Sequence, residues 1–116
     1  MADYSELEER CFDFARRVKE LIKKCKMNVT NIKISGQLID ASGSVGANYI
    51  EANEALSTKD FIYRIRISKK ESKEAKFWLR LIDCEEKDQQ EQNALIQEAK
   101  ELMLIFGGIL QKCLKK

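Results

Sequence analysis

Residues 61–82 carry apolar and small side chains at alternating spacings of four and three, and this rhythm constrains the fold more than any other feature of the sequence. The positions are Phe61, Ile65, Ser68, Ser72, Ala75, Leu79 and Ile82. Side chains three or four residues apart lie on the same face of an α-helix, which has about 3.6 residues per turn. The segment is therefore predicted to be a helix with one buried side.

Comparable apolar periodicity runs from Leu7 to Cys25, from Ile34 to Leu56 and from Leu95 to Cys113. The sequence thus predicts four helices, at residues 6–25, 31–55, 59–83 and 92–114. Short polar connections favour antiparallel neighbours. The chain has 116 residues and no proline, with 44% apolar and 34% charged residues, a mixture typical of helical bundles. We predict an all-α fold, in which residues 1–116 form one up-down-up-down four-helix bundle.

Polar residues at the starts of these segments are candidates for N-caps. Ser5 and Glu8 fit a capping box at the start of the first helix, because the side chain of each can accept a hydrogen bond from the backbone N–H of the other. The second and third helices each offer two candidate caps: Thr30 or Asn31, and Thr58 or Asp60.

A run of small residues interrupts the second predicted helix at residues 41–47, and two of them are Gly43 and Gly46. Each glycine costs a helix about 1 kcal/mol relative to alanine. The simplest explanation is that a neighbouring helix or subunit approaches the backbone closely there. The spacing fits no phosphate-binding glycine motif. Together with a wide apolar face on the fourth helix, this run predicts an oligomer.

A row of cations lies one position beyond the predicted buried side of the third helix. Residues 59–80 hold eight basic and three acidic side chains, whereas residues 85–101 hold six acidic and two basic ones. Neighbours in the row are expected about 5 to 6 Å apart, near the spacing of successive phosphates in a nucleic acid. The row is a candidate phosphate-binding surface; the competing interpretation is a solvated face that keeps a bundle soluble. Its residues are Arg66, Lys69, Lys73, Lys76 and Arg80, with Lys70 alongside.

Two further features bear on the cationic row: polar residues of the second helix and the single tryptophan. Asn48 and Glu51 lie near the buried side, where a carboxylate needs a partner. Trp78 lies off the cationic row, so we expect it in the core or at a subunit interface rather than stacked on a base. The candidate partners for Glu51 are Arg66, Lys69, Lys70 and Lys73.

The composition argues against catalysis and against bound metal. The chain has no histidine, and its four cysteines show no C-x-x-C spacing, so we expect no enzyme activity, no cofactor and no metal site. In the predicted bundle, Cys25 and Cys84 share one end and Cys11 and Cys113 the other. Disulfides are geometrically conceivable there, but a reducing cytosol argues against them, and we interpret the cysteines as small buried side chains.

No apolar run approaches the roughly 20 residues that span a bilayer, and the first ten residues are acidic and polar. We therefore expect a cytoplasmic protein without membrane contact.

The stretch at residues 42–82 resembles the signature of a four-helix-bundle family named after the 23S ribosomal RNA intervening sequences that encode some of its members. The resemblance rests on residues 44–48, Glu51, residues 59–62 and the stretch from residue 70 to residue 79. The sequence departs from the family pattern at residues 49–50 and is more basic than usual at residues 64–68.

This resemblance implies a fold and a class of partner but no activity. Members of this fold, including related accessory proteins of diversity-generating retroelements, form ring-shaped homopentamers with basic surfaces and are implicated in nucleic-acid binding. We therefore expect a non-enzymatic homo-oligomer, a pentamer by resemblance, that binds structured RNA, such as ribosomal RNA, through the cationic row. The alternative is an adaptor that recruits a protein partner, such as a polymerase or nuclease, without touching nucleic acid.

Overall fold

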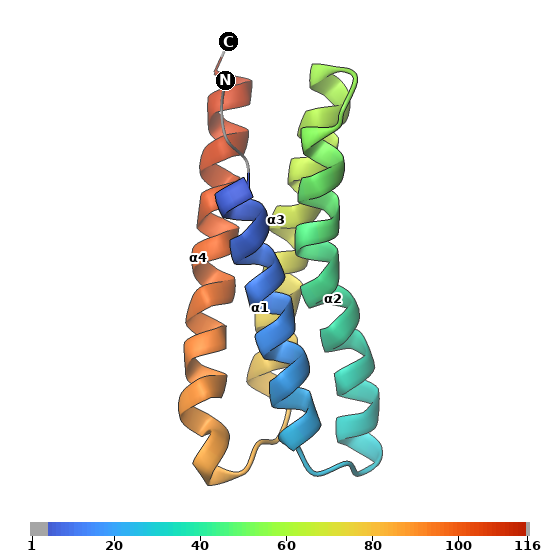
Figure 1. Ribbon diagram of the computed structural model, residues 1–116, viewed down its shortest axis with the longest axis vertical. Coiled ribbons are helices and arrows are strands. Elements are labelled where there is room, and N and C mark those ends of the chain that lie inside the picture. The colour runs from blue at the N-terminus through green and yellow to red at the C-terminus, as the bar shows by residue number, and fades with distance from the viewer. Residues whose placement is uncertain (1–4, 116) are drawn as a thin grey trace.

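The computed structural model describes residues 5–115 and confirms the four-helix bundle (Figure 1). Four helices run antiparallel along a body of about 47 × 22 × 20 Å. A short 3-10 turn precedes the last helix, and the described residues contain no strand. The elements are α1 (Ser5–Lys24), α2 (Val29–Asn53), α3 (Thr58–Leu81), η1 (Glu86–Asp88) and α4 (Gln89–Leu114).

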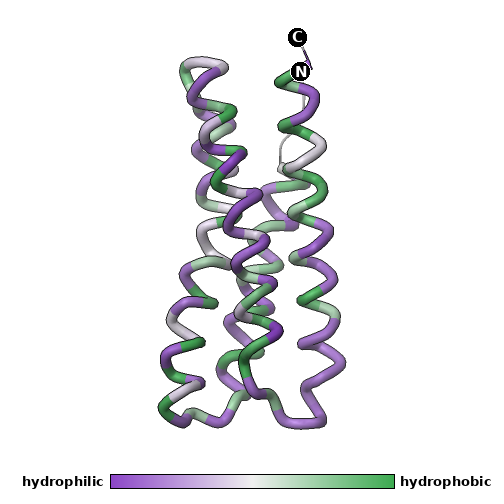
Figure 2. Tube along the Cα trace, turned by 180° about the vertical axis from the view of Figure 1, so that it is seen from behind, coloured by the Kyte–Doolittle hydropathy of each residue, from purple (hydrophilic) through white to green (hydrophobic). Residues whose placement is uncertain are grey.

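Each helix packs against two neighbours, in the cyclic order α1, α2, α3, α4. Helix α1 is the shortest of the four, so α2, α3 and α4 extend past its first residue at the end where α2 turns into α3 (Figure 1). Along every helix, hydrophobic residues alternate with hydrophilic ones (Figure 2). This is the amphipathic pattern that buries one side of each helix in a shared core.

The buried side predicted for α3 is confirmed over its central part. Ile65, Ala75 and Leu79 are fully buried, whereas Phe61 at the start is only half-buried. Two serines complete this side without leaving polar atoms unpaired, because Ser68 Oγ donates to the Val45 carbonyl of α2 at 2.9 Å and Ser72 Oγ donates to the Ser68 carbonyl at 2.8 Å. Small side chains with internal hydrogen bonds let α2 and α3 lie close together.

The predicted N-caps were wrong for α2 and α3. Asn28 caps α2, accepting a hydrogen bond from the Asn31 backbone at 2.9 Å, and Ser57 caps α3, accepting from the Asp60 backbone at 3.1 Å. Helix α2 therefore begins at Val29. The side chain of Ser5, the predicted cap of α1, lies outside the described residues.

Asn31 fastens the two connections at the lower end of the bundle instead of capping a helix. Its side chain is buried, and its amide nitrogen donates to the carbonyls of Lys26 at 2.9 Å and Asp83 at 3.0 Å. Its amide oxygen accepts from the Asp83 backbone at 3.1 Å. Gln92 of α4 adds two bonds, to the carbonyls of Leu79 and Ile82. Asn31 thus joins the α1–α2 connection to the segment after α3, and Gln92 joins α4 to the end of α3.

We expect Asn31→Ala to lower the free energy of unfolding by about 3 kcal/mol, because it removes three hydrogen bonds to backbone groups, each contributing about 1 kcal/mol. Chemical denaturation followed by circular dichroism measures the change. Asn93→Ala, at an exposed position of α4, is the control and should change stability by less than about 0.5 kcal/mol. Equal effects of the two substitutions would contradict the role assigned to Asn31.

Candidate nucleic-acid interface

The cationic row lies on the outer side of α3 and along its border with α4. Five of the six predicted cations are exposed, and Lys76 is half-buried. Lys69 and Lys73 reach the border itself, where they line a groove shared with α4. We call the six residues the basic stripe: Arg66, Lys69, Lys70, Lys73, Lys76 and Arg80.

Within the described chain, no cation of the basic stripe forms a hydrogen bond or an ion pair closer than 4.0 Å. The acidic residues of α4 face α1 instead. Arg10 pairs with Glu98 at 2.8 Å and with Glu101 at 2.9 Å, and Arg17 pairs with Glu91 at 2.8 Å. Because α1 neutralises the carboxylates of α4, these carboxylates do not pair with the basic stripe, whose cations remain available to a partner.

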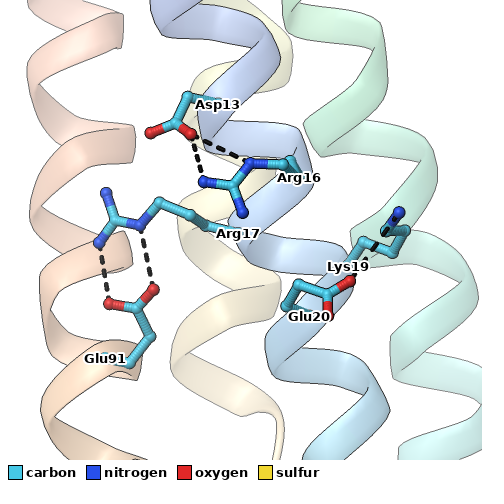
Figure 3. Close-up of polar contacts among 6 residues, drawn as sticks. All are labelled: Asp13, Arg16, Arg17, Lys19, Glu20 and Glu91. Carbon is cyan, nitrogen blue, oxygen red and sulfur yellow. Dashed lines mark hydrogen bonds and ion pairs between the residues drawn. The ribbon is translucent and has the colours of Figure 1, made fainter.

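The α1–α4 pairs have the geometry of strong contacts. Arg17 reaches across to α4 and donates two hydrogen bonds to the carboxylate of Glu91, whereas Arg16 stays on α1 with Asp13 (Figure 3). The hydrogen bonds from Arg17 lower the pKa of Glu91. In the same way, the hydrogen bond to Glu98 raises the pKa of Arg10. The carboxylate of Glu91 is thus held ionised beside α1.

The groove between α3 and α4 has an apolar floor and a cationic wall. Its volume is about 710 Å³, and none of the described residues that line it is acidic. The side chain of Lys69 crosses α4 at Gly107, where a Cβ atom would meet the Lys69 Cε atom at 3.7 Å. A Cβ atom at position 107 would thus be in ordinary van der Waals contact with the lysine chain, and helix α4 continues through Gly107 without a break. The α4 residues of the groove are Met103, Leu104, Gly107, Gly108, Leu110, Gln111 and Leu114.

The partners predicted for the carboxylate of Glu51 on α2 were wrong. Asn48 accepts a hydrogen bond from Arg64 Nη1 at 3.1 Å, and its own amide donates to Ser44. Glu51 is exposed and pairs with no described cation. The reason is geometric: Arg64 lies on the α2 side of α3, whereas the basic stripe lies on the outer side and toward α4.

Sequence reasoning also missed an exposed aromatic ring within the basic stripe. Trp78 is half-buried at the core, and its ring meets that of Phe77 edge to face at 4.9 Å. Phe77 itself is 55% exposed and borders a shallow hollow with Arg80. An exposed ring beside cations is what base stacking requires. The signal in the sequence was the position of Phe77 on the helical wheel, four residues after Lys73.

Helix α2 carries a second unpartnered surface, which we call the α2 outer face. It holds apolar residues and glycines spaced by three or four residues, with a last isoleucine seven residues farther on, and Phe12 of α1 is exposed beside it. The close approach of α1 explains Gly46, because a Cβ atom there would lie 3.0 Å from the Cys11 Cβ atom. A Cβ atom at Gly36 or Gly43 would meet no other part of the described chain within 4 Å. The face consists of Val29, Ile32, Gly36, Ile39, Gly43 and Ile50.

The described residues hold no cluster of three or more histidine, cysteine, aspartate or glutamate side chains suited to a metal ion. Over the same residues, no helix has an apolar stretch long enough to cross a lipid bilayer.

Comparison with known proteins identifies the family. Residues 5–108 match the model of the 23S rRNA-intervening sequence protein family. A crystal structure of a protein of unknown function from the S23 ribosomal protein family of Bacteroides thetaiotaomicron is similar, with a TM-score of 0.75 and 26% sequence identity over 89% of this chain and 96% of that one. No curated protein matches. Neither family name indicates a catalytic reaction. The chain, a four-helix bundle with an unpaired basic stripe, therefore belongs to the 23S rRNA-intervening sequence protein family.

Proposed function

We propose that this protein is a non-enzymatic, oligomeric bundle of the cytoplasm that binds structured RNA, ribosomal RNA among the candidates, through the basic stripe. The observation that carries the proposal is that six cations lie together on α3 and that none of them forms an ion pair within 4.0 Å in the described chain. A stripe that only kept the protein soluble could equally well form ion pairs with the neighbouring acidic residues of α4. These acidic residues instead pair with arginines of α1. Phosphate groups are the ligands that such a surface fits.

The form of the surface favours backbone contacts over base readout. Neighbouring cations of the stripe follow one another at about 5 to 6 Å, which suits consecutive phosphates. The groove that Lys69 and Lys73 border offers apolar floor residues but few hydrogen-bonding groups. Phe77 adds a place where an unpaired base can stack irrespective of its identity. We therefore expect recognition of RNA shape and charge.

We further propose that copies of the chain assemble through the α2 outer face, in a ring of five as the family resemblance implies. Val29 is 73% exposed, Ile32 58% and Ile50 48%, and a Cβ atom at Gly36 or Gly43 would meet no other part of the described chain within 4 Å. Such a row suits close helix packing against a second copy. A ring repeats the basic stripe once per subunit and raises avidity without new contacts.

The α2 outer face also supports the second candidate, an adaptor that recruits a protein partner such as a polymerase or a nuclease. Its exposed isoleucines and Phe12 would fit an apolar helix of that partner. In that case the basic stripe would remain solvated and RNA would bind weakly or not at all.

Titration of two structured RNAs of equal length and unrelated sequence tests the proposal. We expect similar affinities for both, and a logarithm of the binding constant that falls linearly with the logarithm of salt concentration, by roughly 0.7 to 0.9 per phosphate contact. Fluorescence anisotropy between about 0.05 and 0.2 M salt measures this dependence. Absence of binding at the lowest salt would favour the adaptor.

A further inference from the structure

Two cysteines meet at the lower end of the bundle. The Sγ atoms of Cys25, directly after α1, and Cys84, between α3 and η1, lie 3.5 Å apart. The other pair considered from the sequence does not meet. Cys11 lies at the level of Glu98 in α4, and Cys113 lies about 20 Å farther along that helix at 1.5 Å per residue. Only one pair of thiols is therefore placed for a bond within the chain.

We propose that Cys25 and Cys84 form a site of reversible oxidation, where hydrogen peroxide converts the two thiols into a disulfide between the end of α1 and the α3–α4 connection. A disulfide requires the two sulfur atoms to approach to about 2.0 Å. Both residues lie outside the helices, so the remaining distance can be closed by the connections without unwinding a helix.

An oxidant reaches this pair from one side. Cys84 is half-buried and lines a recess of about 180 Å³, whereas Cys25 is only 7% exposed and does not line this recess. The recess admits a molecule of the size of peroxide but no protein. Asn31 lines the same recess and bonds to Asp83, the residue before Cys84, which holds the two connections together. The hydrogen bonds of Asn31 thus hold the two cysteines near each other and also form one wall of the recess through which peroxide reaches Cys84.

The reaction balances with peroxide as the only co-reactant. The Cys84 thiolate attacks one peroxide oxygen, which breaks the O–O bond and leaves a sulfenic acid on Cys84 and a hydroxide ion. The Cys25 thiolate then attacks the Cys84 sulfur, forms the S–S bond and displaces the second oxygen as hydroxide. The two hydroxide ions take up the two thiol protons, so two thiols and one peroxide yield one disulfide and two waters. A dithiol reductant reverses the modification.

The surroundings make this a slow reaction that accelerates with pH. Burial raises the pKa of Cys84 to about 12, and burial also raises the pKa of Cys25. The thiolate of Cys84 is therefore scarce at neutral pH, and its fraction grows about tenfold for each pH unit below the pKa. Lys26 is the cation at the recess, and the carboxylates that oppose the thiolate are Asp83, Glu85 and Asp88.

The test treats the whole protein with hydrogen peroxide at pH 7 and pH 9. We expect free thiols to fall from four to two, faster at pH 9, and peptide mapping to find Cys25 joined to Cys84. The melting temperature should rise by roughly 10 °C, since the bond closes a long loop, and dithiothreitol should reverse the rise. Cys113→Ala should show the same reversible rise in melting temperature, with free thiols falling from three to one.

Cys84→Ala, with its fold checked by circular dichroism, should keep the same melting temperature with and without peroxide. The proposal is overturned if the mapped disulfide joins other cysteines, if the thiols are oxidised without any disulfide, or if Cys84→Ala shows the same peroxide-dependent stabilisation as the parent.

Discussion

The double substitution Ile32→Lys and Ile39→Lys is expected to turn an oligomer into monomers of 13.4 kDa. Both side chains belong to the α2 outer face and are 58% and 38% exposed in the single chain, so lysine is tolerated there in a monomer. At an interface each lysine would lose its water without gaining a partner. We expect the dissociation constant to rise at least about 100-fold, which corresponds to about 2.7 kcal/mol.

Light scattering at micromolar concentration measures the masses of the parent and the variant. A matched pair of glycine substitutions separates assembly from helix stability. Gly43→Ala and Gly108→Ala each add a methyl group with no neighbour within 4 Å in the chain, and each should stabilise its helix by about 1 kcal/mol. Only Gly43→Ala should weaken the assembly. A monomeric parent, or a lysine variant of unchanged mass, would show that the α2 outer face does not join copies.

The sequence predicted the helices well because their periodicity is long and uninterrupted. The buried side of α3 follows from the rhythm of Ile65, Ala75 and Leu79, and no local residue competes with it. The caps were less predictable because adjacent residues have similar chemistry. Asn28, Thr30 and Asn31 can each accept a backbone hydrogen bond, and a shift of a few residues decides which one does.

The role of Asn31 depends on contacts between distant parts of the chain. Its partners Lys26 and Asp83 are separated by the whole of α2 and α3, so no local pattern shows that they meet. The available signal was a polar residue three positions before Ile34, where the apolar periodicity of α2 predicts a buried side chain. A buried amide needs several hydrogen-bond partners.

The basic stripe could be predicted as a row, but not its lack of partners. That property depends on where the carboxylates of α4 point, which a helical wheel of α3 does not contain. A signal was nevertheless present on the other helices. Arg10 and Arg17 are seven residues apart, and Glu91 and Glu98 are also seven apart, as expected for two ion pairs between antiparallel helices.

The triple substitution of Lys69, Lys73 and Lys76 with glutamine is expected to weaken RNA binding by roughly 100-fold near 0.1 M salt and to reduce the salt dependence by about two to three phosphate contacts. Glutamine keeps helix propensity, and two of the three positions are exposed, so the circular dichroism spectrum should not change. The control replaces Lys23, Lys24 and Lys33, exposed lysines of α1 and α2, and removes the same charge.

Fluorescence anisotropy of one structured RNA with the parent, the stripe variant and the control tests the central claim most directly, because both variants fall by three charges from the parent's net charge of +2. The account predicts that the stripe variant loses most of its affinity, while the control loses little at the same salt concentration. A stripe variant that binds as tightly as the parent, or a control that loses as much, would contradict an RNA-binding role for the basic stripe.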